Sequence, residues 1–253
     1  MLKRISLTTY NRLELIREKR GAVAVALIDP DIKNDSSLNS MLNLINNCDF
    51  DTIFVGGSLI SDNEFERRIE LIKSNTDLPI VIFPGSSRQL SKNVDAILFL
   101  SLISGRNPEY LIGEHVKSSP VIYKINLETI PTAYILLDGG KRSSVEIISN
   151  TAAIPMDKHD IITAHALAGQ YLGNKYIFLE SGSGAENHAA TDVVSSLSNF
   201  VDIPIIIGGG IYTPASASEL VNAGAGYIVT GTKIEQLPSS EQLHDFTKAI
   251  HGL

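Results

Sequence analysis

Short, almost uninterrupted apolar runs recur along the chain, and each precedes a segment long enough to form a helix. The clear runs cover residues 23–28, 52–55, 79–83, 96–100, 176–179, 203–207 and 226–229. Runs of this kind are typical of strands buried on both faces, as in a parallel sheet covered by helices. The alternation therefore predicts an α/β protein with a parallel sheet.

The segments between the runs carry apolar residues at helical spacing. They predict helices over residues 38–46, 64–75, 108–117, 160–172, 191–199 and 216–223, with Gly224 as a helix stop, and an extra N-terminal helix within residues 1–20. The stretch 83–96 is short and rich in Ser, Gly and Asn. We therefore expect the helix after the third strand to be reduced or missing.

Two segments compete to be the fifth strand, residues 121–127 and residues 134–137. We favour the first, which would place Lys124 in the middle of a strand. The second would then begin an inserted hairpin over residues 134–148 that turns at Asp138, Gly139 and Gly140.

Eight strand-and-helix repeats could form either a closed barrel or an open, doubly wound sheet. The length of 253 residues is that of a single (β/α)₈ barrel. Every run ends in polar or glycine residues, as if one rim were a common functional face, and no G-x-G-x-x-G opens the first helix. We predict one (β/α)₈ TIM-barrel domain over residues 1–253.

Composition narrows the classes of partner. A formal net charge of −7 disfavours nucleic acid. The single cysteine, Cys48, allows neither an internal disulfide nor a CxxC metal pair. No apolar run reaches the ~18 residues of a membrane span, and residues 1–20 lack the apolar centre of a secretory signal. We expect a soluble, cytoplasmic protein without a transmembrane segment.

Glycine-rich segments follow three consecutive predicted strands near the C-terminus. They contain Ser181, Gly182, Ser183 and Gly184, then Gly208, Gly209 and Gly210, and finally Gly231 and Thr232. Glycine lets successive backbone N–H groups approach an anion, and the loops after strands seven and eight are the usual phosphate site of a TIM barrel. Any one of these glycines could simply make a turn, but together they predict phosphate binding.

Three further positions have side chains suited to chemistry at the strand ends. Glu180 closes an apolar strand, where a carboxylate is costly to bury, and it could orient or deprotonate a substrate hydroxyl. Asp29 and Ser58 end the first two strands, and their oxygens suit Mg²⁺. A turn at Asp29 and a helix cap at Ser58 would explain these two residues equally well.

Two basic residues give weaker signals. Arg106, after the fourth strand, is a candidate clamp for diphosphate, although a solvated loop arginine is almost as good an explanation. Lys124 could form a Schiff base with a carbonyl substrate, which keeps an aldolase open as an alternative.

Taken together, the motifs resemble the geranylgeranylglyceryl phosphate synthase family, which also contains bacterial heptaprenylglyceryl phosphate synthases. The matching segments, in order, cover residues 27–31, 55–58, 83–86, 104–113, 179–180 with 182–185, 208–211 and 231–232. The resemblance covers nearly the whole chain and is greater to the larger, group II branch than to the heptaprenyl branch.

The resemblance implies a reaction and a set of binding residues. A polyprenyl diphosphate, usually geranylgeranyl diphosphate, would be joined through an ether bond to the sn-3 hydroxyl of sn-glycerol 1-phosphate, with release of diphosphate. Mg²⁺ would be held through Asp29 and Ser58. The glycerol phosphate would lie on the segment Phe178, Leu179, Glu180, Ser181, Gly182, Ser183 and Gly184, on Gly208, Gly209 and Gly210, and on Gly231 and Thr232.

The family resemblance further implies a barrel without a normal third helix and a homo-oligomer, either a dimer or a hexamer. Two positions depart from the family pattern. Phe178 stands where the family usually has tyrosine, and Tyr176 on the same strand face could substitute for it. Ile32 separates Lys33 from the Asp-Pro-Asp motif, which puts a phosphate role for that lysine in doubt. A non-catalytic binder of a phosphorylated lipid precursor is a further alternative.

Overall fold

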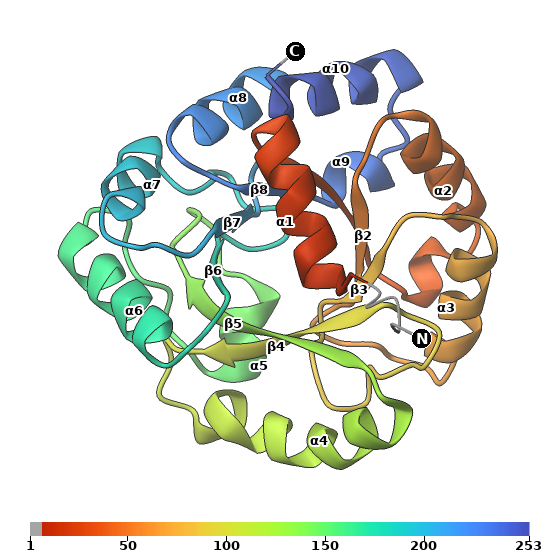
Figure 1. Cartoon of the computed structure of the whole chain (residues 1–253), viewed down its shortest axis with the longest axis horizontal. Helices are drawn as coiled ribbons and strands as arrows, with labels where there is room; N and C mark the ends of the chain where they lie inside the picture. Colours follow the sequence, from red (N-terminus) through yellow and green to blue (C-terminus); the bar gives the residue numbers. More distant parts are fainter. Residues whose placement is uncertain (1–6, 253) are drawn as a thin grey trace, which may run out of the picture.

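The computed structural model describes residues 7–252, and eight parallel strands in it close into a barrel in chain order (Figure 1). The last strand pairs with the first over residues 23–26 and 227–230, which completes the ring. The predicted (β/α)₈ fold is confirmed. The strands are β1 (Val23–Ile28), β2 (Thr52–Val55), β3 (Ile80–Ile82), β4 (Ala96–Leu102), β5 (Glu128–Leu136), β6 (Tyr176–Glu180), β7 (Ile205–Gly208) and β8 (Tyr227–Thr230).

Helices surround the barrel, except on the side after β3. Residues 83–95, all within the described part, form no helix, as expected from their composition. The helices are α1 (Thr9–Arg20), α2 (Leu38–Asn47), α3 (Phe65–Ser74), α4 (Glu114–Ile125), α5 (Ser144–Ser149), α6 (His159–Tyr171), α7 (Thr191–Ser198), α8 (Pro214–Asn222), α9 (Thr232–Glu235) and α10 (Ser240–Ile250). A 3₁₀ turn (Ile32–Asn34) follows β1, and a π-helical turn (Glu109–Gly113) precedes α4.

Each strand contributes to two apolar cores, because successive side chains point to opposite faces. One set, including Ala24, Ile53 and Leu179, packs outward against the helices. The other set, including Val25, Phe54 and Phe178, fills the inside of the barrel. Burial on both faces explains why the strands are apolar almost throughout.

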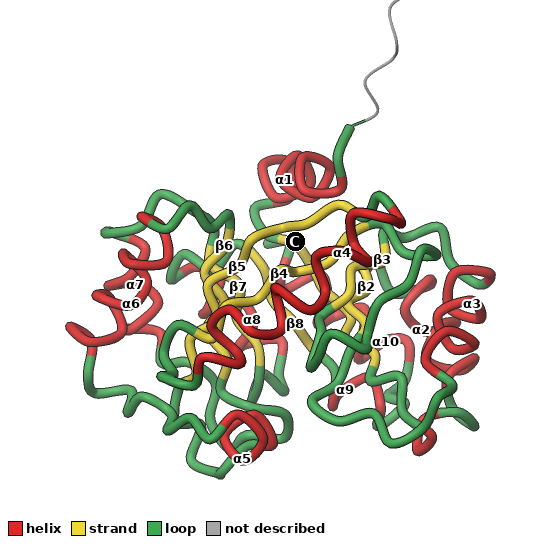
Figure 2. Tube along the Cα trace, turned by 90° about the horizontal axis from the view of Figure 1, so that it is seen from below, coloured by secondary structure: helices red, strands yellow, loops and turns green. Residues whose placement is uncertain are grey.

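Helix α1 closes the N-terminal end of the barrel. Leu13 is fully buried in the inner core, and the Glu128 carboxylate accepts hydrogen bonds from the backbone N–H groups of Thr9 and Tyr10 at 2.6 and 3.0 Å. Figure 2 shows α1 across one end of the barrel and α5 at the opposite end. The C-terminal strand ends are therefore the face left for a site. The part of the predicted N-terminal helix within residues 1–6 lies outside the described residues.

The fifth strand is β5, and our preference for residues 121–127 was wrong. Residues 121–125 end α4, in which His115, Ser118 and Ile122 are buried at helical spacing, and Asn126 terminates the helix in a left-handed conformation (φ 53°). Lys124 is therefore an exposed helix residue and does not lie in a strand.

Residues 134–136 do not begin an inserted hairpin either. Seven residues of β5 pair with β4, from Glu128 opposite Ala96 to Tyr134 opposite Leu102, so this segment is the end of the strand. The chain then forms a loop and the short helix α5, which begins with a capping box between Ser143 and Glu146.

Candidate active site

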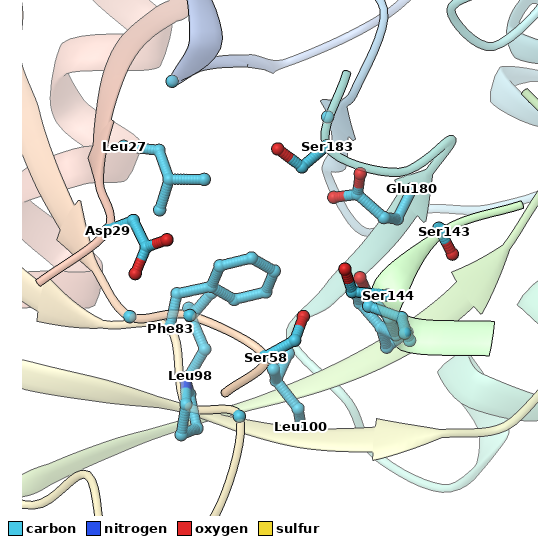
Figure 3. Close-up of a pocket in the computed structure, with 18 of the residues that line it drawn as sticks. Leu27, Asp29, Ser58, Phe83, Leu98, Leu100, Ser143, Ser144, Glu180 and Ser183 are labelled. Carbon is cyan, nitrogen blue, oxygen red and sulfur yellow. The ribbon is translucent and has the colours of Figure 1, made fainter. Parts of the chain in front are cut away.

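A cavity of about 590 Å³ opens at the C-terminal ends of the strands. This is the functional face of TIM barrels, and the volume is within the range of small-molecule sites. In Figure 3, Asp29 and Glu180 point into the space from opposite sides, with the ring of Phe83 between them. The cavity thus brings together candidate residues from both ends of the sequence.

Glu180 ends β6 and is only 6% exposed. Burial raises the pKa of its carboxyl to about 7, and a hydrogen bond of 2.7 Å from the Gly182 N–H to Oε1 offsets only part of that effect. No described cation forms an ion pair with it. A carboxylate with a pKa near neutrality is well matched to accept a proton from a substrate.

The glycines after β7 are required by the close approach of the β6 loop. Gly209 has a positive φ of 85°, and a Cβ at this position would lie 2.6 Å from the Gly182 oxygen and 2.8 Å from Glu180 Oε1. A Cβ at Gly208 would lie 2.7 Å from Glu180 Oε2. The glycine run therefore makes room for Glu180 and leaves backbone groups at the cavity wall.

Asp29 follows β1 on the opposite side of the cavity. Its Oδ2 forms an ion pair with Lys33 Nζ at 2.9 Å, whereas its buried Oδ1 has no hydrogen-bond partner among the described residues. Burial raises the pKa of Asp29, and the hydrogen bond from Lys33 counteracts that effect. An unsatisfied buried carboxylate oxygen is costly, and Oδ1 is therefore available to accept a hydrogen bond or to bind a cation.

Gly57 and Ser58 lie beside Asp29 on the loop after β2. A Cβ at Gly57 would collide with Asp29 Oδ1, so only glycine allows the carboxylate to take this position. Ser58 is half-buried and lines the same cavity. A carboxylate oxygen and a hydroxyl fit a hard cation that keeps most of its water or substrate oxygens. No cluster of three or more His, Cys, Asp or Glu residues suited to a metal was found in residues 7–252.

Most of the predicted phosphate-binding residues line the cavity, and some do not. Those at its wall are Glu180, Ser183, Gly184, Gly208, Gly209, Gly210, Gly231 and Thr232. Four of the predicted residues lie behind this wall, namely Phe178, Leu179, Ser181 and Gly182. The Leu179 side chain packs outward against the helices, and the Ser181 N–H donates a hydrogen bond to the Gly208 carbonyl at 3.0 Å. These four residues can shape the site without facing its space.

Arg106 does not reach the cavity. Its guanidinium donates to the carbonyls of Ile103 and Gly105 and lies 3.4 Å from His165 Nε2 on α6. The structure therefore does not bring this predicted clamp together with the other site residues.

Phe178 belongs to the aromatic floor beneath the cavity. It stacks on Phe83 at 5.0 Å between ring centroids and contacts Tyr134 at 5.3 Å. The expectation that Tyr176 could replace the missing hydroxyl was wrong, because the Tyr176 hydroxyl is bonded to that of Tyr227 at 2.8 Å, in a network with Glu14 of α1. Tyr134, opposite Phe178 on β5, is the tyrosine of this layer that lines the cavity.

Several cavity residues were missed by sequence reasoning. Lys33 reaches Asp29 despite the inserted Ile32, because the 3₁₀ turn Ile32–Asn34 returns the side chain toward β1. Ser143 and Ser144 line the cavity from the start of α5, a segment predicted as a hairpin. A Ser-x-x-Glu capping signal at Ser143 was present in the sequence and could have identified this helix.

The cavity continues from its polar end into an apolar arm. This part is lined by residues of β4, of the helix-free loop after β3 and of α5, and Leu98 and Leu100 of β4 are labelled among the lining residues in Figure 3. Its apolar lining comprises Phe83, Leu90, Ile97, Leu98, Phe99, Leu100, Leu102, Val145, Ile147 and Ile148. One end of the cavity therefore suits a charged, hydroxylated molecule and the other a hydrocarbon chain.

Comparison with known proteins gives one consistent family. A model of the PcrB family matches residues 14–250. A geranylgeranylglyceryl phosphate synthase of Chitinophaga pinensis is 42% identical over 93% of each chain, and one of Thermococcus kodakarensis is 35% identical over the full length of both. A crystal structure of (S)-3-O-geranylgeranylglyceryl phosphate synthase from Thermoplasma acidophilum, in complex with its substrate sn-glycerol-1-phosphate, has a TM-score of 0.88 and 36% identity, and the match covers 97% of this chain and 99% of that one.

Proposed function

The chain belongs to the PcrB family, and from this premise we propose that it joins geranylgeranyl diphosphate to the sn-3 hydroxyl of sn-glycerol 1-phosphate and releases diphosphate. The observation that carries the proposal is the cavity itself. Its polar end combines glycine-rich strand ends with the buried Glu180, and its other end is an apolar arm. These two environments match the two substrates.

The glycerol phosphate is assigned to the rim after β6, β7 and β8. Ser183, Gly184, Gly209 and Gly210 line this part, and α9 begins at Thr232. Backbone N–H groups and a serine hydroxyl can bind phosphate oxygens here, and Glu180 lies close enough to this rim to meet a hydroxyl of the same molecule.

Glu180 is assigned as the group that takes the proton. The sn-3 hydroxyl oxygen attacks the first carbon of the prenyl chain, and the bond from that carbon to the diphosphate oxygen breaks. The proton of the hydroxyl passes to the carboxylate, and diphosphate leaves with the bonding electron pair. A carboxylate whose pKa is raised to about 7 by burial is a stronger base than an exposed glutamate.

The diphosphate is assigned to the side of Asp29 and Ser58. These residues would hold Mg²⁺ through the unpartnered Asp29 Oδ1 and the Ser58 hydroxyl. A bound Mg²⁺ would neutralise charge on the departing diphosphate. Lys33 is half-exposed beside Asp29, and its ammonium group can contribute a further positive charge at the same place.

We extend the proposal to the oligomeric state and the cellular location of the protein. Ile112, Val116 and Tyr123 are exposed along the π-helical turn and α4, which supports a homo-oligomer, dimer or hexamer. Cys48 is buried as a free thiol, which suits the reducing cytoplasm. No helix within the described residues is long and apolar enough to cross a membrane.

The first experiment is turnover of radiolabelled sn-glycerol 1-phosphate with geranylgeranyl diphosphate, with and without Mg²⁺. An organic-soluble product that depends on both substrates supports the proposal. Tight binding of both substrates without product would instead favour a non-catalytic binder. The Schiff-base alternative is no longer supported, because Lys124 is exposed on α4, away from the cavity.

A further inference from the structure

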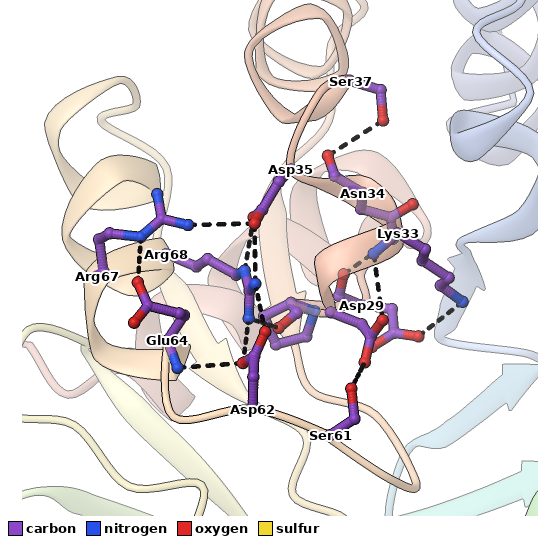
Figure 4. A network of polar contacts seen from close by, with 12 residues as sticks. Asp29, Lys33, Asn34, Asp35, Ser37, Ser61, Asp62, Glu64, Arg67 and Arg68 are labelled. Carbon is purple, nitrogen blue, oxygen red and sulfur yellow. Dashed lines mark hydrogen bonds and ion pairs between the residues drawn. The ribbon is translucent and has the colours of Figure 1, made fainter.

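Arg68 on α3 is a charged side chain buried outside the cavity, with only 1% of it exposed. All five of its N–H groups are used (Figure 4). Nε and Nη2 donate to the two Asp35 oxygens at 2.6 and 2.9 Å. Nη1 and Nη2 donate to the two Asp62 oxygens at 2.7 Å each, and Nη1 also donates to the Pro30 carbonyl at 3.0 Å.

The groups that Arg68 binds come from the two loops that carry the proposed cation ligands. Pro30 and Asp35 lie on the loop after β1, and Pro30 directly follows Asp29. Asp62 lies on the loop after β2, four residues beyond Ser58. The guanidinium therefore ties these loops to each other and to α3.

The network is charged and stays charged at neutral pH. The hydrogen bonds from Arg68 hold the pKa of Asp62 at about 2 and lower that of Asp35, and the two carboxylates raise the pKa of Arg68. Arg68 lines no part of the cavity. Its contacts therefore act on the site only through the loops that it holds.

We propose that Arg68 is a positioning residue that keeps Asp29 and Ser58 in place, and that its fork of five donors thereby sets the affinity of the site for a divalent cation with diphosphate. The inference rests on the proposed function for its ligand class. Only a planar guanidinium can bind two carboxylates and a carbonyl in this way, so lysine, although equally charged, cannot replace it.

The test is Arg68→Lys, with Arg67→Lys as the matched control. Arg67 is the next residue on α3 and also pairs with Asp35, but 52% of its side chain is exposed. The probe is Mn²⁺ with inorganic diphosphate, and bound Mn²⁺ is measured from the loss of the free-ion EPR signal. We expect Arg68→Lys to weaken Mn²⁺ binding about 10- to 100-fold, as is usual for residues that orient metal ligands. Arg67→Lys should change it less than about twofold, as for an exposed pair.

Kinetics provide the second readout. In Arg68→Lys the Mg²⁺ concentration for half-maximal turnover should rise by a similar factor, and excess Mg²⁺ should restore most of the rate. The KM for glycerol phosphate should stay within about twofold, because Arg68 contacts no residue of the described segments after β6, β7 and β8. Unchanged Mn²⁺ binding, or an equal change in the Mg²⁺ requirement and in this KM, would overturn the inference.

Two further outcomes are decisive. If Arg68→Lys does not fold, Asp62→Asn replaces it, since it weakens only the contact to the loop after β2; wild-type Mn²⁺ affinity in that variant would overturn the inference. If the wild-type protein binds Mn²⁺ and diphosphate but makes no prenyl ether, the proposed function fails. The Mn²⁺ binding measurements alone then test whether Arg68 positions the cation ligands.

Discussion

The rim after β6, β7 and β8 and the rim after β1 and β2 border one cavity and adjoin where β8 pairs with β1, but they are shaped by different means. On the first, glycine backbone packs around one buried carboxylate, Glu180, whose bonded partner is the Gly182 N–H. On the second, charged side chains dominate: Asp29 is paired with Lys33, and Arg68 ties both loops together. Backbone conformation suits a fixed anion site. In the second rim the Arg68 pairs are buried and hold the loops, whereas the more exposed Lys33 can exchange Asp29 for another anion.

The largest effect that separates the two rims is expected from Glu180→Gln. Glutamine keeps the size of the side chain and can still accept the hydrogen bond from the Gly182 N–H, but it cannot accept a proton from the substrate. We expect kcat/KM to fall about 10²- to 10⁴-fold, with substrate binding nearly unchanged. Steady-state kinetics together with calorimetric binding of glycerol phosphate measure the two separately. A loss of affinity in proportion to the rate would make Glu180 a binding group only.

The same substitution should stabilise the protein at high pH. The pKa of Glu180 is about 7 in the folded chain, above its usual value of 4.5, so the folded state binds the extra proton between these values. The wild type should therefore lose stability as pH rises from about 4.5 to 7, by up to roughly 3 kcal/mol. Glu180→Gln should lack this loss. Urea unfolding of both proteins at pH 5 and pH 8 measures this difference. If the free energy of unfolding changes equally with pH in both proteins, the titrating group is not Glu180.

On the opposite rim, Asp29→Asn should act mainly on the cation. The amide keeps the shape but removes the charge that pairs with Lys33 and is available at Oδ1. We expect the Mg²⁺ concentration for half-maximal turnover to rise by about 10²-fold, at the upper end of the range for altered metal sites. The KM for glycerol phosphate should change little. A Mg²⁺ titration of initial rates would detect this, and an unaltered titration would remove Asp29 from the cation site.

The smallest expected effect comes from Gly209→Ala, which tests the backbone construction of the first rim. The new Cβ would clash with Gly182 at a positive φ, so the loop after β6 must shift. We expect the KM for glycerol phosphate to rise about tenfold, as in other misplaced sites. Gly173→Ala is the control, because Gly173 has nearly the same φ, 87°, but no atom within 4 Å of a Cβ. It should lower stability and leave this KM unchanged; the same KM change in both variants would contradict the packing explanation.

The same contrast explains what could be predicted from sequence. The barrel was predictable because strands buried on both faces are apolar throughout. The fifth strand was not, because it begins with Glu128, whose carboxylate binds the start of α1, and because it contains Pro131. Residues 121–125 are rich in β-branched side chains but continue a helix that already packs through His115 and Ser118.

Within the site, short sequence motifs were visible and distant charges were not. Glu180 and the glycines could be identified because each lies next to its strand end in the sequence. The Arg68 network joins residues 33 and 6 positions apart along the chain, a spacing that carries no signal by itself. Likewise, nothing in the segment around Arg106 indicated that its side chain would bind the carbonyls of its own loop.

The contact between Gly57 and Asp29 has a consequence for how this rim can evolve. A side chain at position 57 would occupy the space of Asp29 Oδ1. A lineage therefore cannot acquire one while the carboxylate keeps its place, and a lineage that loses the carboxylate no longer needs the glycine. The two positions are therefore linked, although they are 28 positions apart in the sequence: across descendants of this chain, a side chain should appear at position 57 only where the carboxylate at position 29 has moved or been lost.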